Sequence, residues 1–211
     1  MRHRRKGRTL GRIPSHQRAL LRSLASALIL TEGEFESDDK GKPKVKGRIV
    51  TTIQKAKEAR PLVERCVTIA IRALPQIETA SGLETSAERG SEEWKKWRHG
   101  PGWQEWNRAI APVITARRRT LQLLGSKQAV QILFDEVAPR FSDRPGGYTR
   151  VLRLAKPRLG DGGIRAILEF VGVHDRKRRK AARPAFESET ETPAEESSSS
   201  EAPVTESAAA D

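Results

Sequence analysis

The chain has 211 residues with 40 Lys or Arg against 27 Asp or Glu, giving a formal net charge of +13 and a pI near 10.4. Apolar residues make up 36% of the chain and aromatic residues 5%, so we expect part of it not to fold by itself. The single cysteine excludes an internal disulfide and a zinc site built on several cysteines, and no apolar stretch approaches the roughly 20 residues of a membrane helix.

Charge is concentrated at the two ends of the chain. Residues 1–22 carry eight cations and no acid, whereas residues 185–211 carry eight acids and no base. Without the acidic end, residues 1–184 have a net charge of +21, which calls for a polyanionic partner. Nucleic acid is favoured over a membrane surface, because no amphipathic helix pairs a basic face with a large apolar one.

Residues 1–14 hold glycines and a proline among arginines without an apolar period, which predicts an extended arm that orders only on a partner. A helix is expected over residues 15–30, with Ser15 as its N-cap and leucines at helical spacing. Arg18 and Arg22 lie one turn apart on the other side of that helix. We interpret them as phosphate contacts rather than as a merely solvated face.

Residues 32–47 are charged and rich in Gly, Asp and Lys, which predicts a loop, and residues 48–51 suit a short strand. A second helix is expected from Thr52, kinked or restarted at Pro61. Cys66 lies within its apolar stripe and is interpreted as a core residue rather than a nucleophile. The stripe consists of Ile53, Ala56, Leu62, Val63, Cys66, Val67, Ala70 and Leu74.

Residues 76–112 contain all four tryptophans, in two pairs with a spacing of three residues on either side of a Gly-Pro-Gly segment. This pattern predicts two short helical pieces joined by a tight break. The indoles suit stacking on bases, but packing on one another or on the body is the favoured interpretation.

Further helix is expected over residues 127–137, ended by Pro139. A strand through Ala155 and a second strand over residues 164–173, connected by a glycine-rich turn, should pair as an antiparallel hairpin.

Six cations over residues 174–183 precede the acidic tail, which we expect to be disordered. The tail either screens the basic body before RNA arrives or is a solubilising extension, and the second interpretation is favoured.

Sequence motifs for catalysis are absent. The chain has no G-x-S-x-G, H-E-x-x-H or phosphate-binding G-x-x-x-x-G-K-[ST] pattern, and Gly160-Asp161-Gly162-Gly163 is interpreted as a turn. The four histidines lack metal-ligand spacing, and His3 and His16 are interpreted as phosphate or base-edge partners. We therefore expect no enzyme activity, no metal and no cofactor.

Three blocks of sequence, residues 1–29, 51–70 and 133–171, resemble in order the bacterial large-subunit ribosomal protein seventeen family. Characteristic points are Thr-Thr and Lys-Ala-Lys-Glu in the second block and Pro-Arg-Phe, Gly-Gly-Tyr-Thr-Arg and Arg-Leu-Gly-Asp in the third. The loop at 32–47, the segment at 76–112 and the tail after Val173 are longer than that family usually has. Because the resemblance begins at Met1, we expect the arginine-rich start to be a mature arm rather than an organelle transit peptide.

The resemblance implies an α+β fold: a compact mixed helix and strand domain over residues 15–173 with a C-terminal antiparallel hairpin, a basic RNA-binding arm over 1–14 and a tail over 174–211. It implies a monomeric, non-catalytic constituent of the bacterial cytoplasmic ribosome that binds 23S-type large-subunit ribosomal RNA near the peptide exit tunnel, beside other large-subunit proteins. The alternative is a non-ribosomal nucleoid or regulatory protein that binds nucleic acid. The residues expected to contact RNA are Arg2, His3, Arg4, Arg5, Lys6, Arg8, Arg12, His16, Arg18, Arg22, Gly146, Gly147, Tyr148, Arg150, Arg153, Lys156 and Arg158.

Overall fold

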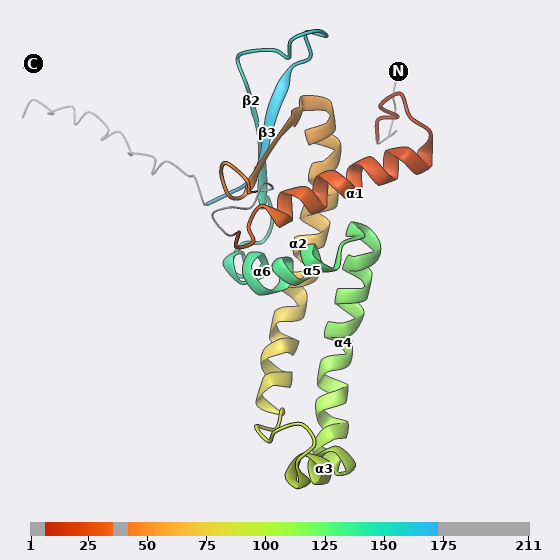
Figure 1. Ribbon diagram of the computed structural model, residues 1–211, viewed down its shortest axis with the longest axis vertical. Coiled ribbons are helices and arrows are strands. Elements are labelled where there is room, and N and C mark those ends of the chain that lie inside the picture. The colour runs from red at the N-terminus through yellow and green to blue at the C-terminus, as the bar shows by residue number, and fades with distance from the viewer. Residues whose placement is uncertain (1–6, 36–41, 173–211) are drawn as a thin grey trace, which may run out of the picture. The chain divides into compact units, whose positions relative to one another are not determined.

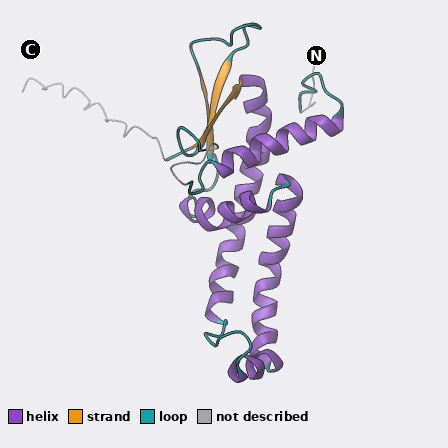
Figure 2. Ribbon diagram, in the orientation of Figure 1, coloured by secondary structure: helices purple, strands orange, loops and turns teal. Residues whose placement is uncertain are grey.

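A computed structural model of the chain describes residues 7–35 and 42–172 (Figure 1). The expectations for Arg2 to Lys6, for the cations at 174–183 and for the acidic tail lie outside the described residues. Helices and a small sheet make up a mixed α+β fold, as predicted (Figure 2). In chain order the elements are α1 (Pro14–Leu30), β1 (Arg48–Thr52), α2 (Ile53–Gly82), α3 (Glu92–His99), α4 (Pro101–Leu124), α5 (Lys127–Ile132), the π-helical segment η1 (Leu133–Val137), α6 (Ala138–Arg140), β2 (Thr149–Arg153) and β3 (Arg165–Phe170).

The sheet has three antiparallel strands in the order β1-β3-β2. The predicted hairpin of the last two strands is confirmed, although both strands are shorter than expected. The strand predicted at 48–51 pairs with the other edge of β3, so that Val50 and Leu152 both lie opposite Ile167. This third strand joins segments more than 100 residues apart, which sequence periodicity does not reveal.

The core forms where α2 packs against α1 and one face of the sheet. The apolar stripe predicted for α2 faces the core: Val63, Cys66 and Val67 are fully inaccessible, and Ile53, Leu62 and Leu74 are partly buried against the same cluster. Leu28 of α1 and Leu168 of β3 belong to the same cluster. Burial raises the pKa of the Cys66 thiol to about 12, so this side chain is a neutral core group, as expected.

Two expected helix boundaries are wrong, and at a third position one of two expected alternatives is excluded. Ser15 is not the N-cap of α1, because Ile13 occupies that position and Pro14 begins the helix, where a missing N–H has no cost. Helix α2 continues through Pro61, so the alternative of a restart at that residue is excluded. Pro139 does not end the helical region either, since η1 leads directly into α6, in which Pro139 lies in the first turn.

Helices α2 and α4 lie side by side and carry α3 at their far end (Figure 1). The break between the two predicted tryptophan helices falls at Gly100, and the second helix is much longer than expected. The rings of Trp97 and Trp106 meet edge to face with centroids 5.9 Å apart. The Arg98 guanidinium lies 5.3 Å from the Trp94 ring and 5.0 Å from the Trp103 ring. All four indoles are half-buried, which supports the packing interpretation.

Candidate nucleic-acid interface

The outer face of α1 presents two arginines at a fixed orientation. Burial of Leu28 and Ile29, with a 2.9 Å hydrogen bond from Ser26 Oγ to the Leu124 carbonyl of α4, fixes the rotation of the helix about its axis. Arg18 and Arg22 lie one turn apart on the side of the helix away from Leu20 and Leu24, as predicted, and both are exposed in its N-terminal half. With Ser15, Ala19 and Ser23 they line a surface hollow of about 380 Å³. The helix contains no acidic residue, so this face is uniformly cationic.

The described part of the arm folds back instead of being extended, which corrects the expectation for residues 7–13. The amide of Arg12 donates to the Thr9 carbonyl at 3.1 Å, and Leu10 adopts a left-handed φ of 55°. The Arg12 side chain is half-buried and donates to the Leu10 carbonyl at 2.9 Å. Arg8 forms an ion pair with Glu58 of α2 at 3.4 Å. The exposed His16 lies in the first turn of α1, directly after this folded segment.

The loop before β2 combines an exposed turn with a buried aromatic residue. Gly147 has a φ of 65°, a conformation that favours glycine, and both it and Gly146 leave the backbone accessible. Tyr148, in contrast, is only 4% exposed, and its ring lies 5.4 Å from that of Phe141. Its ring is therefore part of the core and offers no face on which a base can stack.

Arg150 is held within the fold by a buried carboxylate on β3. Glu169 is fully inaccessible, and its Oε1 accepts from Arg150 Nε at 2.6 Å. Its Oε2 lies 3.0 Å from Nη2 of Arg48 on the other neighbouring strand. The antiparallel register places these three residues in one row, with Glu169 directly opposite both arginines. Sequence reasoning missed this triad, because only the pairing of β1 with β3 brings its members together.

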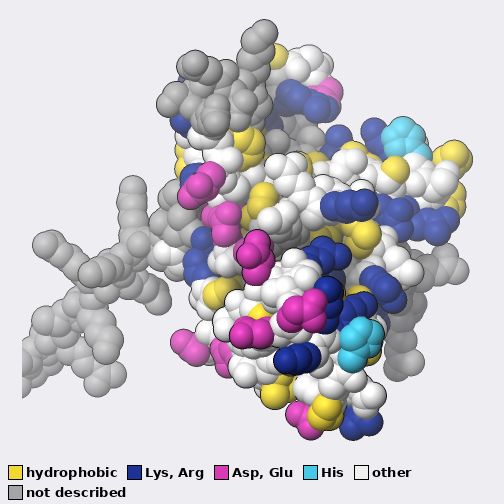
Figure 3. All heavy atoms as spheres, turned by 60° about the horizontal axis from the view of Figure 1, so that its bottom comes forward, with side chains coloured by type: hydrophobic (Ala, Val, Ile, Leu, Met, Phe, Trp, Pro, Cys, Tyr) yellow, Lys and Arg dark blue, Asp and Glu magenta, His cyan; other side chains and the backbone are white. Residues whose placement is uncertain are grey.

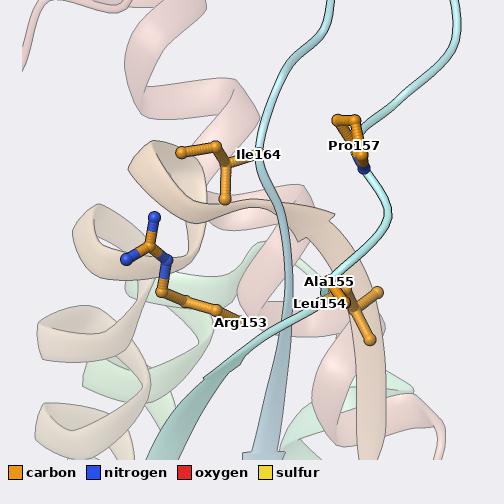
Figure 4. A pocket seen from close by; sticks show the side chains of 5 residues that line it. All are labelled: Arg153, Leu154, Ala155, Pro157 and Ile164. Carbon is orange, nitrogen blue, oxygen red and sulfur yellow. The ribbon is translucent and has the colours of Figure 1, made fainter.

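The end of the β2–β3 hairpin carries the remaining predicted cations. Arg153 lines an open groove of about 430 Å³ with Leu154, Pro157 and Ile164 (Figure 4). Lys156 is exposed, and its carbonyl accepts from Arg165 Nε at 3.2 Å. Arg158 pairs with Asp161, with 2.9 Å between its Nε and Oδ1. Hydrogen bonds from Arg158 and from the Gly163 amide hold the pKa of the Asp161 carboxyl well below its usual range.

The predicted cations thus form two groups. Arg18 and Arg22 of α1 have no ion pair within the part of the chain that the structure describes, whereas Arg150 and Arg158 are paired with acids of the same chain. Lys and Arg side chains gather on one half of the face shown in Figure 3, and acids gather on the other half.

Among the described residues there is no cluster of His, Cys, Asp and Glu that could hold a metal ion. Over residues 7–35 and 42–172 no helix is long and apolar enough to cross a bilayer.

Comparison with known proteins identifies the family. The family model described as ribosomal protein L17 matches residues 20–171. The chain is 63% identical over 187 residues to a large ribosomal subunit protein bL17 of Rhodopirellula baltica, covering 89% of each chain. It is 36% identical over 170 residues to the protein of that name from Nitratidesulfovibrio vulgaris, covering 81% of this chain and 87% of that one. The corresponding protein of Thermus thermophilus is 34% identical over 171 residues, covering 81% of this chain and 99% of its own.

These matches extend over the helices and the sheet and agree with the blocks of sequence that first indicated the resemblance. The chain belongs to the ribosomal protein L17 family, and it is a structural ribosomal protein rather than an enzyme.

Proposed function

We propose that this chain is a structural constituent of the large ribosomal subunit that binds 23S-type ribosomal RNA through its basic arm and the outer face of α1. Its bL17 relatives are large-subunit proteins by name, and residues 1–184 carry a net charge of +21. The site of action is the bacterial cytoplasm, near the peptide exit tunnel and beside other large-subunit proteins, where one copy is incorporated. This placement rests on the family resemblance.

The observation that carries the proposal is the face of α1. Arg18 and Arg22 are exposed, lie one helical turn apart and line one surface hollow. No acid occurs within the helix or in the 13 residues before it. Guanidinium groups in this arrangement bind phosphate oxygens in a bidentate manner and displace condensed counterions. The packing of α1 against the core holds the helix that carries both arginines in place before RNA binds.

The chain has three functional parts in this proposal. Residues 1–14 enter between RNA helices, residues 15–173 form the platform, and residues 174–211 are an appendage. Within the platform the exposed backbone of Gly146 and Gly147 and the cations of the hairpin end, Arg153, Lys156 and Arg158, make secondary contacts. Since phosphates carry no base identity, the shape of the folded RNA determines where the protein binds.

The test measures binding to deproteinised large-subunit ribosomal RNA across a range of salt concentrations. The variant Arg18→Gln/Arg22→Gln should lose affinity about tenfold and show a shallower salt dependence, because two phosphate contacts disappear. Arg89→Gln/Lys96→Gln removes the same charge from exposed positions near the tryptophans and should leave affinity nearly unchanged. Equal losses in both variants would show that only net charge matters and would contradict the proposed interface.

Sedimentation separates the proposal from the nucleoid or regulatory alternative. A ribosomal constituent should migrate in stoichiometric amount with large subunits after a high-salt wash. A protein recovered with DNA, or released into the free fraction by that wash, would support the alternative instead.

A further inference from the structure

A second basic groove lies between α2 and α4, away from the residues assigned above. The two helices run side by side (Figure 1) and leave a groove of about 270 Å³ between them. Arg72 and Gln76 of α2 line it from one side, and Thr115 and Arg119 of α4 from the other. Both arginine side chains are exposed. Two guanidinium groups on separate helices thus border one groove.

Acidic residues are missing from the parts of both helices that form this groove. In α2 no acid occurs between Glu64 and Glu78, and in the following helices none occurs between Glu105 and Asp135. The segments contain further exposed cations, Arg65 and Arg108 among them. Arg117 pairs with Asp135 at 3.6 Å, but Arg72 and Arg119 have no acidic partner among the described residues. We call this part of the helix pair, residues 65–77 and 106–124, the shaft.

The tip of the same helix pair, residues 78–105, has the opposite character. It contains six acids and four cations. Lys95 pairs with Glu92 at 2.8 Å, and Arg98 lies over the rings of Trp94 and Trp103. A polyanion is therefore attracted to the shaft and not to the tip. Because the uncompensated cations extend along the shaft, a continuous polyanion fits it better than a single carboxylate of a protein partner.

We infer that the shaft groove is a second RNA-binding site, in which Arg72 and Arg119 hold a backbone phosphate of a ribosomal RNA segment. This inference rests on the proposed function, since it takes ribosomal RNA as the partner. The guanidinium of each arginine offers parallel N–H donors to phosphate oxygens, and their separate helices fix the approach of the RNA from two sides. The Thr115 hydroxyl already donates to the Ala111 carbonyl at 3.0 Å, so its oxygen remains an acceptor for a ribose hydroxyl.

The experiment compares three double variants of the full chain for binding to deproteinised large-subunit ribosomal RNA. Arg72→Gln/Arg119→Gln tests the groove, Arg18→Gln/Arg22→Gln tests α1, and Arg89→Gln/Lys96→Gln on the tip is the matched control. The groove variant should lose affinity about tenfold, and the slope of log affinity against log salt should fall by about 0.8, since one phosphate contact is lost. The tip control should change affinity about twofold or less. Thermal unfolding of all three should match the parent, because every substituted side chain is exposed.

Each outcome separates the groove from the proposed function. A loss of RNA affinity in the groove variant, with nearly unchanged affinity in the tip control, supports the inference whether or not the α1 variant also loses affinity. A loss of RNA affinity in the α1 variant alone overturns the inference about the groove and leaves the proposed interface on α1 standing. No loss in any variant overturns both. If the groove variant still binds RNA normally but no longer binds polyglutamate, the groove serves an acidic protein and the inference is wrong.

Discussion

The outer face of α1 and the outer face of the sheet each present a pair of arginines, but in opposite surroundings. Arg18 and Arg22 lie on a helix without acids. Arg48 and Arg150 flank the inaccessible Glu169 at 3.0 Å and 2.6 Å. The first pair remains available to another molecule, whereas the second neutralises a buried carboxylate. The tertiary fold, and not residue type, decides which arginines are already paired within the chain.

Removing the buried carboxylate gives the largest expected effect. Glu169→Gln leaves two guanidinium groups facing each other across a neutral amide, and breaking a buried ion pair costs about 3 kcal/mol of the free energy of unfolding. Denaturant titration of the full chain measures this loss. The matched change on α1, Arg18→Gln/Arg22→Gln, should leave stability within about 0.5 kcal/mol. Equal stabilities of the two variants would remove the distinction between the faces.

Deletion of residues 1–12 tests the proposed role of the basic arm. Ile13 is retained, because its carbonyl accepts the Gln17 amide at 2.9 Å at the beginning of α1. Six cations are removed, so affinity for large-subunit ribosomal RNA should fall about 100-fold at moderate salt. The melting temperature should change little, since the ion pair that joins Arg8 to Glu58 of α2 is part-exposed and such pairs stabilise a fold weakly. Unchanged affinity at every salt concentration would contradict the role of the arm.

The elements with a strong apolar period were predictable from the sequence. The stripe of α2 around Val63 and Val67 is buried, because a helix with apolar residues three and four positions apart presents one apolar face. The pairing of β1 with β3 was not predictable, since a short strand does not indicate its distant partner. The continuation of helical structure past Pro139 was missed for a local reason. Proline is well tolerated in the first turn of a helix, and Pro139 lies in the first turn of α6, which follows η1 directly.

The candidate interface divides in the same way. The exposure of Arg18 and Arg22 follows from their spacing against the leucines of their own helix. The engagement of Arg150 depends on Glu169, which is 19 residues away and is placed opposite it by strand register. Local spacing therefore predicts which face a side chain occupies, whereas long-range pairing determines whether its charge is free to bind.

Tyr148 lies in the core, although the sequence predicted that it contacts RNA. Its ring packs against Phe141, so Tyr148→Leu should lower the free energy of unfolding by about 1.5 kcal/mol because aromatic packing is removed. Affinity for ribosomal RNA, measured well below the melting temperature, should remain that of the parent. A weaker affinity at unchanged stability would restore Tyr148 to the interface.

The exposed ion pair of Arg158 and Asp161 is intermediate between the unpaired arginines of α1 and the arginines that pair with the buried Glu169. It gives the smallest expected effect. Asp161 holds the Arg158 guanidinium at the hairpin end, and both side chains are about half exposed. Asp161→Asn should free that guanidinium for phosphate and raise affinity for ribosomal RNA about threefold, with a steeper salt dependence. The control Asp143→Asn removes an exposed acid that does not pair with an arginine within the described residues, and should give a smaller gain. Equal gains would mean that Asp161 does not restrain Arg158 at the hairpin end.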